Sequence, residues 1–533
     1  MKKLSAKSAA AQTDRFLIGG GFFVFAIAIL WALFFVPMNM DEAGIYHLLA
    51  CRAYPFAPLN TFREACGTQN DLMLPFGLHI AHSEFYTGIW HSVLYAPFYF
   101  LFHTSGAQYA FNLCFLLAFA ALLARATAKP LLSFALVLAF FPFVFQFVHD
   151  TGPVTYAMLM FPLSAVFLKK IMDASPTRYF YAAVWAFLVL AAIEEKPFFV
   201  YLLPSLGFFA LALTVKDKNF GDGMARLKKA RGALLTGAFL LITGTLLLFF
   251  STSRNGDFYI VWLTALTQRA LPVGSWFGSF ADFLLYWPSY ARYTFDLAGN
   301  SLTQLLFSLA VVGFFLAGLA AAIFLLRRNA ARKLRWIFLG LSFLSSAVIF
   351  LVLRNTWAGH HFVFLWVPLI VLFADLAASL APGPALGLVS AFLVLNLWSI
   401  GALTQAPLQI RNAGERAAIF RFFADDARAS QSIIDFSSWG GYYIQSLYGP
   451  KNQLVTYTEP YDQQLLDNLP LMPEDARRLL SLAHKTGRRL YVICTGAACN
   501  KMALDAVFKD AVAFEDALPG LQNWRVFAAG PRH

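Results

Sequence analysis

The chain has 533 residues, of which 59% are hydrophobic and 13% charged. These proportions exclude an ordinary soluble domain, in which about a quarter of the residues are charged, and they indicate a polytopic membrane protein. The net charge of +12 does not indicate nucleic-acid binding, because membrane proteins retain Lys and Arg in their cytoplasmic loops.

Eleven apolar segments have about the length that a helix needs to cross the ~30 Å hydrocarbon core of a bilayer. They lie at 16–36, 107–124, 131–148, 153–168, 179–193, 198–215, 232–250, 301–326, 336–353, 362–378 and 385–404. If the N-terminus is cytoplasmic, cytoplasmic segments hold twenty basic residues and outer segments hold seven. This asymmetry predicts a cytoplasmic N-terminus. The first segment is predicted to be a retained helix, since no small-residue cleavage site follows its long apolar run.

Acidic residues follow the opposite distribution. Of the sixteen Asp and Glu residues before position 405, eleven fall on the predicted outer side. Acids contribute little to membrane topology, so insertion does not require this bias. It indicates that the chemistry of the protein takes place on the outer side.

The first outer segment, at about 37–106, begins with two adjacent acids in "PMNMDEAGIYHLLACR". Asp41 and Glu42 either mark the water interface or provide a general base that accepts a proton from an attacking hydroxyl. The dipeptide alone does not decide between these readings. Further along, "GIWHSVLYAPFYFLFH" predicts a helix lying at the membrane interface, because a crossing there would invert every later loop.

The cysteines follow the same topology. Cys51 with Cys66, and Cys494 with Cys499, fall in outer segments, where an oxidising compartment allows disulfides. Cys114 lies within an apolar segment and is predicted to be inert core.

Two short outer turns carry further ionisable residues. His149 and Asp150 follow the third apolar segment, and "AIEEKPFF" places Lys196 after two glutamates. Each turn is either an ordinary polar turn that ends two helices or part of a shared outer cavity. Three adjacent ionisable residues in so short a turn favour a functional role.

Cations come later on the same side. Arg254 begins the second long outer segment, at about 251–300, while Arg354 and His360 precede the tenth apolar segment. Arg suits a phosphate because it offers bidentate hydrogen bonds, although a single Arg can equally reach up to lipid headgroups. A divalent metal has no support, because the histidines match no ligand spacing, and no cofactor is predicted.

Composition changes after residue 404. Stretches such as "SIIDF", "QLVTY", "RRLYVIC" and "NWRVFAA" alternate with helical patterns in 405–533. This alternation predicts a small α/β domain, which the eleven crossings would place outside the cytoplasm. The predicted domains are therefore 1–404, a transmembrane domain with long outer loops, and 405–533.

The order of these motifs resembles that of the GT-C glycosyltransferases. It runs through "MDEAGIY", the aromatic "YAPFYFLFHTSGAQYAFNL", "FALVLAFFPFVF" with its following His-Asp turn, "LAAIEEKPFFVYLLP" and "HHFVFLWVPLIVLFAD", over roughly 16–378. The most similar branch is the bacterial group of dolichyl-phosphate-mannose-protein mannosyltransferases and aminoarabinose lipid A transferases. The sequence departs from it at "AHSEFYTGIWHSVLYAPFY", where a His-Pro-Pro-Leu-Tyr-like run is usual.

The resemblance implies transfer of a sugar, with inversion, from a polyprenyl-phosphate donor to a lipid, glycan or protein acceptor at the outer face of a bacterial inner membrane. Asp41 matches the family's catalytic base, and Glu42 its acidic neighbour. Asp150 matches a second acid. Lys196 and Arg254 match positions where the family has cations near the lipid phosphate, and Arg354 and His360 are predicted from the residues to bind that phosphate as well.

Two other classes of function stay open. A transporter or lipid flippase would also be polytopic, although such proteins usually carry ionisable residues near the bilayer midplane, whereas here they gather at one face. A non-catalytic subunit of an envelope glycan assembly system is the third reading.

Overall fold

The computed structural model describes most of the helical part of the chain. It covers residues 2–35, 105–149, 153–173, 176–195, 197–214, 220–250, 333–352 and 363–404, the strands given below, and single positions within 94–101, 306–322 and 481–487. Two compact units are present. Unit 1 comprises Met1–Phe34, Tyr86–Gly88 and Asn112–Pro407, and unit 2 comprises Phe35–Phe85, Ile89–Phe111 and Leu408–His533. The predicted boundary after residue 404 stays a prediction.

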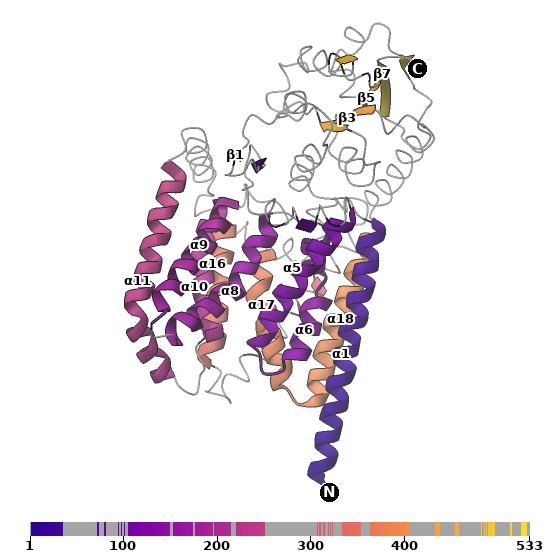
Figure 1. Cartoon of the computed structure of the whole chain (residues 1–533). Helices are drawn as coiled ribbons and strands as arrows, with labels where there is room; N and C mark the ends of the chain where they lie inside the picture. The colour runs from indigo at the N-terminus through magenta and orange to yellow at the C-terminus, as the bar shows by residue number, and fades with distance from the viewer. Residues whose placement is uncertain are drawn as a thin grey trace. The chain divides into compact units, whose positions relative to one another are not determined.

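Unit 1 is built from helices that run side by side (Figure 1). They are α1 Lys2–Phe35, α5 Ser105–Arg125, α6 Pro130–Ala139, α7 Phe141–Val144, the π-helix η2 Phe145–His149, α8 Pro153–Asp173, α9 Arg178–Glu195, the 3-10 helix η3 Pro197–Leu202, α10 Leu203–Thr214, α11 Phe220–Phe250, α16 Lys333–Val352, α17 Val363–Ser379 and α18 Pro382–Thr404. Every predicted apolar segment except 301–326 coincides with one of these helices or with a consecutive group of them. Within 301–326 only single helical positions are described.

Several of these helices can cross a bilayer. In the described part of the chain, five are long and apolar enough, within α1, α8, α11, α16 and α18, and the bent pair Pro130–Ala139 and Phe141–Val148 makes up to six. Shorter apolar helices lie at Ala110–Arg125, Phe198–Thr214 and Val363–Ser379. The chain is therefore a helical membrane protein. Eleven crossings and a cytoplasmic N-terminus stay predictions.

Small and polar side chains join the helices of unit 1. The lipid around a membrane protein is as apolar as its side chains, so close packing and hydrogen bonds hold membrane helices together. A Cβ at Gly21 of α1 would lie 3.0 Å from the carbonyl oxygen of Ala135 in α6, so the two backbones approach closely. Between α10 and α16, the buried Ser205 hydroxyl donates to the carbonyl oxygen of Ser342 at 2.7 Å, and Ser346 donates to the Ser205 Oγ at 2.8 Å.

One span is broken. Between α6 and α7 the axis bends by 66°, at Phe140, whose backbone is extended (φ −76°, ψ 100°). The Oδ1 of Asn396 in α18 accepts the backbone N–H of Phe141 at 2.8 Å, while its Nδ2 donates to the carbonyl oxygen of Phe392. A helix break inside a membrane needs such a partner, because the lipid cannot satisfy the freed backbone groups.

Ion pairs gather at one end of unit 1. Arg335 at the start of α16 meets Asp375 near the end of α17, with Nε 2.6 Å from Oδ2, and its Nη1 donates to the carbonyl oxygen of Ala126 at 2.7 Å. Lys129 lies 2.7 Å from Asp14. Two further contacts link α11 to α8 and α9: Arg226 to Asp173 at 2.8 Å, and Arg178 Nη1 to the carbonyl oxygen of Lys229 at 2.6 Å. We call this set of residues the paired end.

Unit 2 contains a five-stranded mixed sheet. Its strands, in the spatial order β4-β3-β5-β7-β6, are β3 Ser432–Phe436, β4 Leu454–Tyr457, β5 Arg489–Thr495, β6 Val512–Ala513 and β7 Trp524–Ala529. β3 pairs in parallel with β4 and β5, whereas β7 is antiparallel to β5 and β6. The four predicted strands are confirmed, and β6, only two residues long, was missed. A separate α/β domain outside the cytoplasm stays a prediction.

The predictions for the long outer segments and for the cysteines can be compared with the structure only in part. Segments 37–106 and 251–300 lie almost wholly outside the described residues, although β1 Leu72–Met73 pairs antiparallel with β2 His79–Ile80. Cys51, Cys66 and Cys499 also lie outside them, so both disulfides stay predictions. The placement of Cys114 in the core was wrong, because its side chain is exposed on α5. A lipid-facing helix surface is as apolar as a core, so composition could not separate the two.

Candidate active site

A buried carboxylate lies at the end of α9. Glu195 is 0% exposed, and its neighbour Glu194 is half-buried. The sequence predicted these two glutamates in a turn, but they form the last helical residues before η3. An ionisable side chain buried in a membrane protein is costly and is usually functional. The end of α9 is therefore the starting point of the candidate site.

Tyr156 of α8 belongs to the same place. α8 and α9 are consecutive, antiparallel helices, so the start of one lies beside the end of the other. Both Glu195 and Glu194 act electrostatically on the Tyr156 phenol, which is only 5% exposed. A phenol beside two carboxylates supplies one hydrogen-bond donor among groups that accept.

Phenylalanine rings form an apolar layer next to this cluster. The ring of Phe364, in the first turn of α17, lies 5.8 Å from that of Phe198 and 6.1 Å from that of Phe199, both in η3. Phe161 of α8 lies 5.9 Å from Phe364. All four side chains are fully buried. Such a layer excludes water and strengthens electrostatic interactions between the neighbouring charged groups.

The broken span reaches the same end of unit 1. Its last turn is the π-helix η2, and single π-turns are frequent at functional sites. Gln146 in η2 and Thr155 in the first turn of α8 are buried, one before and one after positions 150–152 in the sequence. From α1, the ring of Trp31 lies 5.2 Å from Phe141 and 6.0 Å from Phe145. The end of α1 therefore also points here. We call the set of Gln146, Thr155, Tyr156, Glu194 and Glu195 the glutamate end.

Every predicted site residue lies outside the described residues. These residues are Asp41, Glu42, Asp150, Lys196, Arg254, Arg354 and His360. The structure therefore does not show which of their side chains meet.

The helix ends that flank these positions are described. η2 ends directly before Asp150, and α9 ends directly before Lys196. α16 ends shortly before Arg354, and α17 begins shortly after His360. α11 runs parallel to α9, because a Cβ at Gly237 would lie 3.4 Å from the Cβ of Ala182 and because Lys229 meets Arg178.

These directions bring the flanking ends together. The ends of α1, η2, α9, α11 and α16 and the start of α17 all lie at the end of unit 1 opposite the ion pairs. The described helix ends next to Asp150, Lys196, Arg254 and Arg354 thus all lie at one end of unit 1, although these positions are far apart in the sequence.

Tyr156 and Asn396 were missed by sequence reasoning. Tyr156 stands in "GPVTYAMLM", where an aromatic residue at a helix start is ordinary. Asn396 is a single amide in an apolar run, and that was an available signal, because a polar residue within a membrane span usually has a partner. Among the described residues no group of three or more His, Cys, Asp or Glu side chains could hold a metal ion.

Comparison of the chain with protein-family models and with curated proteins finds no match. The resemblance to the GT-C glycosyltransferases therefore rests on the motif order alone.

Proposed function

We propose that the protein is an inverting membrane glycosyltransferase of the GT-C type, which moves a sugar from a polyprenyl-phosphate donor to a lipid, glycan or protein acceptor of the bacterial cell envelope. The observation that supports it most is the convergence of helix ends at the glutamate end. The described helices that flank Asp150, Lys196, Arg254 and Arg354 all lead there, and the end also holds the fully buried Glu195.

The reaction needs a general base for the acceptor hydroxyl and cations for the phosphate leaving group. The acceptor hydroxyl attacks the anomeric carbon while the bond from that carbon to the phosphate oxygen breaks, and Asp41 takes the hydroxyl proton as general base. The polyprenyl phosphate leaves as an anion, whose charge Lys196, Arg254, Arg354 and His360 stabilise. Glu42 and Asp150 support the base. Glu195 and Tyr156 hydrogen-bond the sugar hydroxyls, and the phenylalanine layer beside them keeps water out.

The test is transfer from a radiolabelled polyprenyl-phosphate sugar by the purified protein. Asp41→Asn should lower the rate by roughly 10²- to 10⁴-fold, which is the usual contribution of a general base. Asp14→Asn is the matched control, because Asp14 is an acid at the paired end of α1 and bonds Lys129. Its rate should match that of the wild type. Full transfer by Asp41→Asn would refute the base, and no donor consumption by the wild type would refute the enzyme.

A second pair of variants tests the glutamate end itself. Glu195→Gln should lower transfer roughly ten- to a hundredfold, the value of one charge-assisted hydrogen bond. Glu194→Gln should have a smaller effect, since Glu194 is half-buried. Equal effects of the two variants would argue against a specific role for Glu195.

One observation favours the rival reading as a transporter or lipid flippase. Transporters often build their sites from discontinuous helices, and α6 and α7 form a span with a 66° break. Proteoliposomes loaded with a fluorescent polyprenyl-phosphate lipid separate the two functions. Movement of that lipid between leaflets without sugar transfer would establish the transporter.

A further inference from the structure

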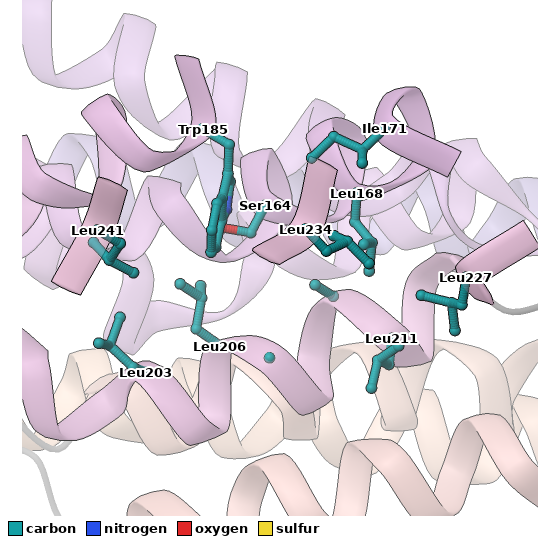
Figure 2. Close-up of a pocket in the computed structure, with 12 residues that line it drawn as sticks. Ser164, Leu168, Ile171, Trp185, Leu203, Leu206, Leu211, Leu227, Leu234 and Leu241 are labelled. Atoms are coloured by element: carbon teal, nitrogen blue, oxygen red, sulfur yellow. The ribbon is translucent and has the colours of Figure 1, made fainter. Parts of the chain in front are cut away.

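An apolar cavity of about 270 Å³ lies among α8, α9, α10 and α11. Figure 2 shows its lining, with Leu203 and Leu206 of α10 on one side and Trp185 and Leu241 across from them. The cavity continues to Leu227 at its other extremity. It is separate from the glutamate end, because neither glutamate nor Tyr156 lines it.

The helix packing explains why this space exists. α10 and α11 both pack on α8, and α11 also packs on α9. The side chains of these helices do not fill the space between α10 and α11 completely, and the cavity is what remains. Leu227, Leu234 and Leu241 line it from α11 at intervals of seven residues and thus from one face. From Leu227 to Leu241 the helix rises by about 21 Å, which exceeds half of the ~30 Å hydrocarbon core.

The chemistry of the walls selects an aliphatic occupant. The polar atoms that Ser164 and Trp185 contribute are bonded to each other, since the Trp185 Nε1 donates to the Ser164 Oγ at 3.0 Å. The remaining lining is aliphatic or glycine. On its opposite face α11 exposes Leu235, Phe239 and Ile242, as a helix in contact with lipid does. A lipid acyl chain is therefore present next to α11, and its aliphatic surface matches the aliphatic lining of the cavity.

The charges at one extremity select the headgroup. Leu227 stands between Arg226 and Lys228, and Ile171, which also lines the cavity, follows Lys170. Lys169, Lys170, Lys228 and Lys229 are exposed. The neighbouring acid Asp173 is neutralised by Arg226 at 2.8 Å. This rim is therefore positive, and basic pockets between membrane helices bind anionic lipid headgroups.

We propose that the cavity between α10 and α11 binds one chain of an anionic membrane phospholipid, whose headgroup lies on the lysines of α8 and α11 at the paired end. The site is distinct from the proposed active site, and it holds whether or not the protein transfers a sugar. The bound chain fills the space that α10 and α11 leave between them and so stabilises their packing on α8.

The test is the melting temperature of the purified full-length protein in detergent, measured with added phosphatidylglycerol and, separately, phosphatidylcholine with the same chains. Phosphatidylglycerol should raise the melting temperature of the wild type by several degrees more than phosphatidylcholine does. Lys228→Gln/Lys229→Gln should abolish that difference. Its control is Arg125→Gln/Lys333→Gln, which removes two exposed cations elsewhere and should retain the difference.

A second variant tests whether a lipid acyl chain occupies the cavity. A side chain added at Gly207 would meet nothing within 4 Å of its Cβ, because Gly207 lines the cavity. Gly207→Leu should therefore fill the space, raise the melting temperature without lipid and remove the response to both lipids. Gly340→Leu is the matched control: Gly340 is exposed on α16 with the same open surroundings, and its variant should respond as the wild type does.

Two results would overturn the proposal. Equal stabilisation of the wild type by both phospholipids would refute recognition of the headgroup, and an unchanged lipid response of Gly207→Leu would refute occupation of the cavity. The lysine variants lie on the surface of α11, so they decide the headgroup question even if Gly207→Leu does not fold.

Discussion

At the paired end of unit 1 acids meet bases directly, whereas at the glutamate end the fully buried carboxylate lies among a phenol and aromatic rings. Arg335 and Asp375 join two helices through an ion pair of 2.6 Å. Glu195 instead lies within the electrostatic reach of Tyr156, next to the phenylalanine layer.

The difference separates stability from chemistry. An ion pair between two helices fixes the helix ends, whereas an ionisable side chain buried in a membrane protein is usually retained for function. We therefore expect changes to the ion pairs to alter stability and not sugar transfer, and changes that reach the glutamate end to alter transfer.

The largest expected effect is at Arg335. Arg335→Met should lower the free energy of unfolding by about 3–5 kcal/mol, because it leaves a buried carboxylate without its cation; the Asp375 side chain is 6% exposed. Thermal or denaturant unfolding in detergent measures this loss. Sugar transfer per folded molecule should stay at the wild-type value.

The double variant Arg335→Met/Asp375→Leu sharpens this prediction. It removes both charges, and replacing a buried ion pair by apolar side chains is often neutral, so most of the lost stability should return. Lys333→Gln is the control, since Lys333 is exposed on the same helix. A loss of transfer per folded Arg335→Met molecule would contradict the separation of the two ends.

Much of the bundle could be predicted from the sequence, and the reason is physical. A run such as 131–148 must be helical in a bilayer, because only a helix or a closed barrel satisfies its backbone there. The strands of 432–436 and 489–495 followed from alternation and turn residues. The count of crossings does not follow so simply, because the apolar helices Ala110–Arg125, Phe198–Thr214 and Val363–Ser379 are short.

The candidate site was harder to predict from the sequence than the helices were. Sequence reasoning found the glutamates of "AIEEKPFF" because adjacent charges are conspicuous in an apolar chain. It could not find that Glu195 is buried and acts electrostatically on Tyr156, because this depends on how α8 and α9 pack. Cys114 was misplaced for the related reason that lipid-facing and core residues have the same composition.

An intermediate effect is expected at Asn396. Its side chain accepts a backbone hydrogen bond at the break between α6 and α7, which precedes η2 and the glutamate end, so a change there should affect both stability and transfer. Asn396→Leu leaves the backbone N–H of Phe141 buried without its acceptor, which should cost roughly 1–3 kcal/mol. Because η2 ends directly before Asp150, transfer should fall as well. Unfolding and transfer are measured on the same preparation.

The control for Asn396 is Ser399→Ala. Ser399 lies nearly one turn further along α18, and its hydroxyl bonds only locally, donating to the carbonyl oxygen of Leu395 at 2.9 Å. This variant should change neither quantity. If Asn396→Leu lowered stability but left transfer intact, the break would have a structural role and would not contribute to sugar transfer.

The smallest expected effect is at Asp173, which pairs with Arg226 at 2.8 Å, with 40% and 59% of the two side chains exposed. Asp173→Asn should cost less than about 1 kcal/mol, the usual range for solvent-exposed pairs. That cost should disappear at roughly 1 M salt, where charges are screened within a few ångströms. Unfolding measured at low and high salt checks both statements. A cost as large as that of Arg335→Met, or one that salt does not reduce, would mean that the two ion pairs act as one network, because an isolated exposed pair cannot provide so much stability.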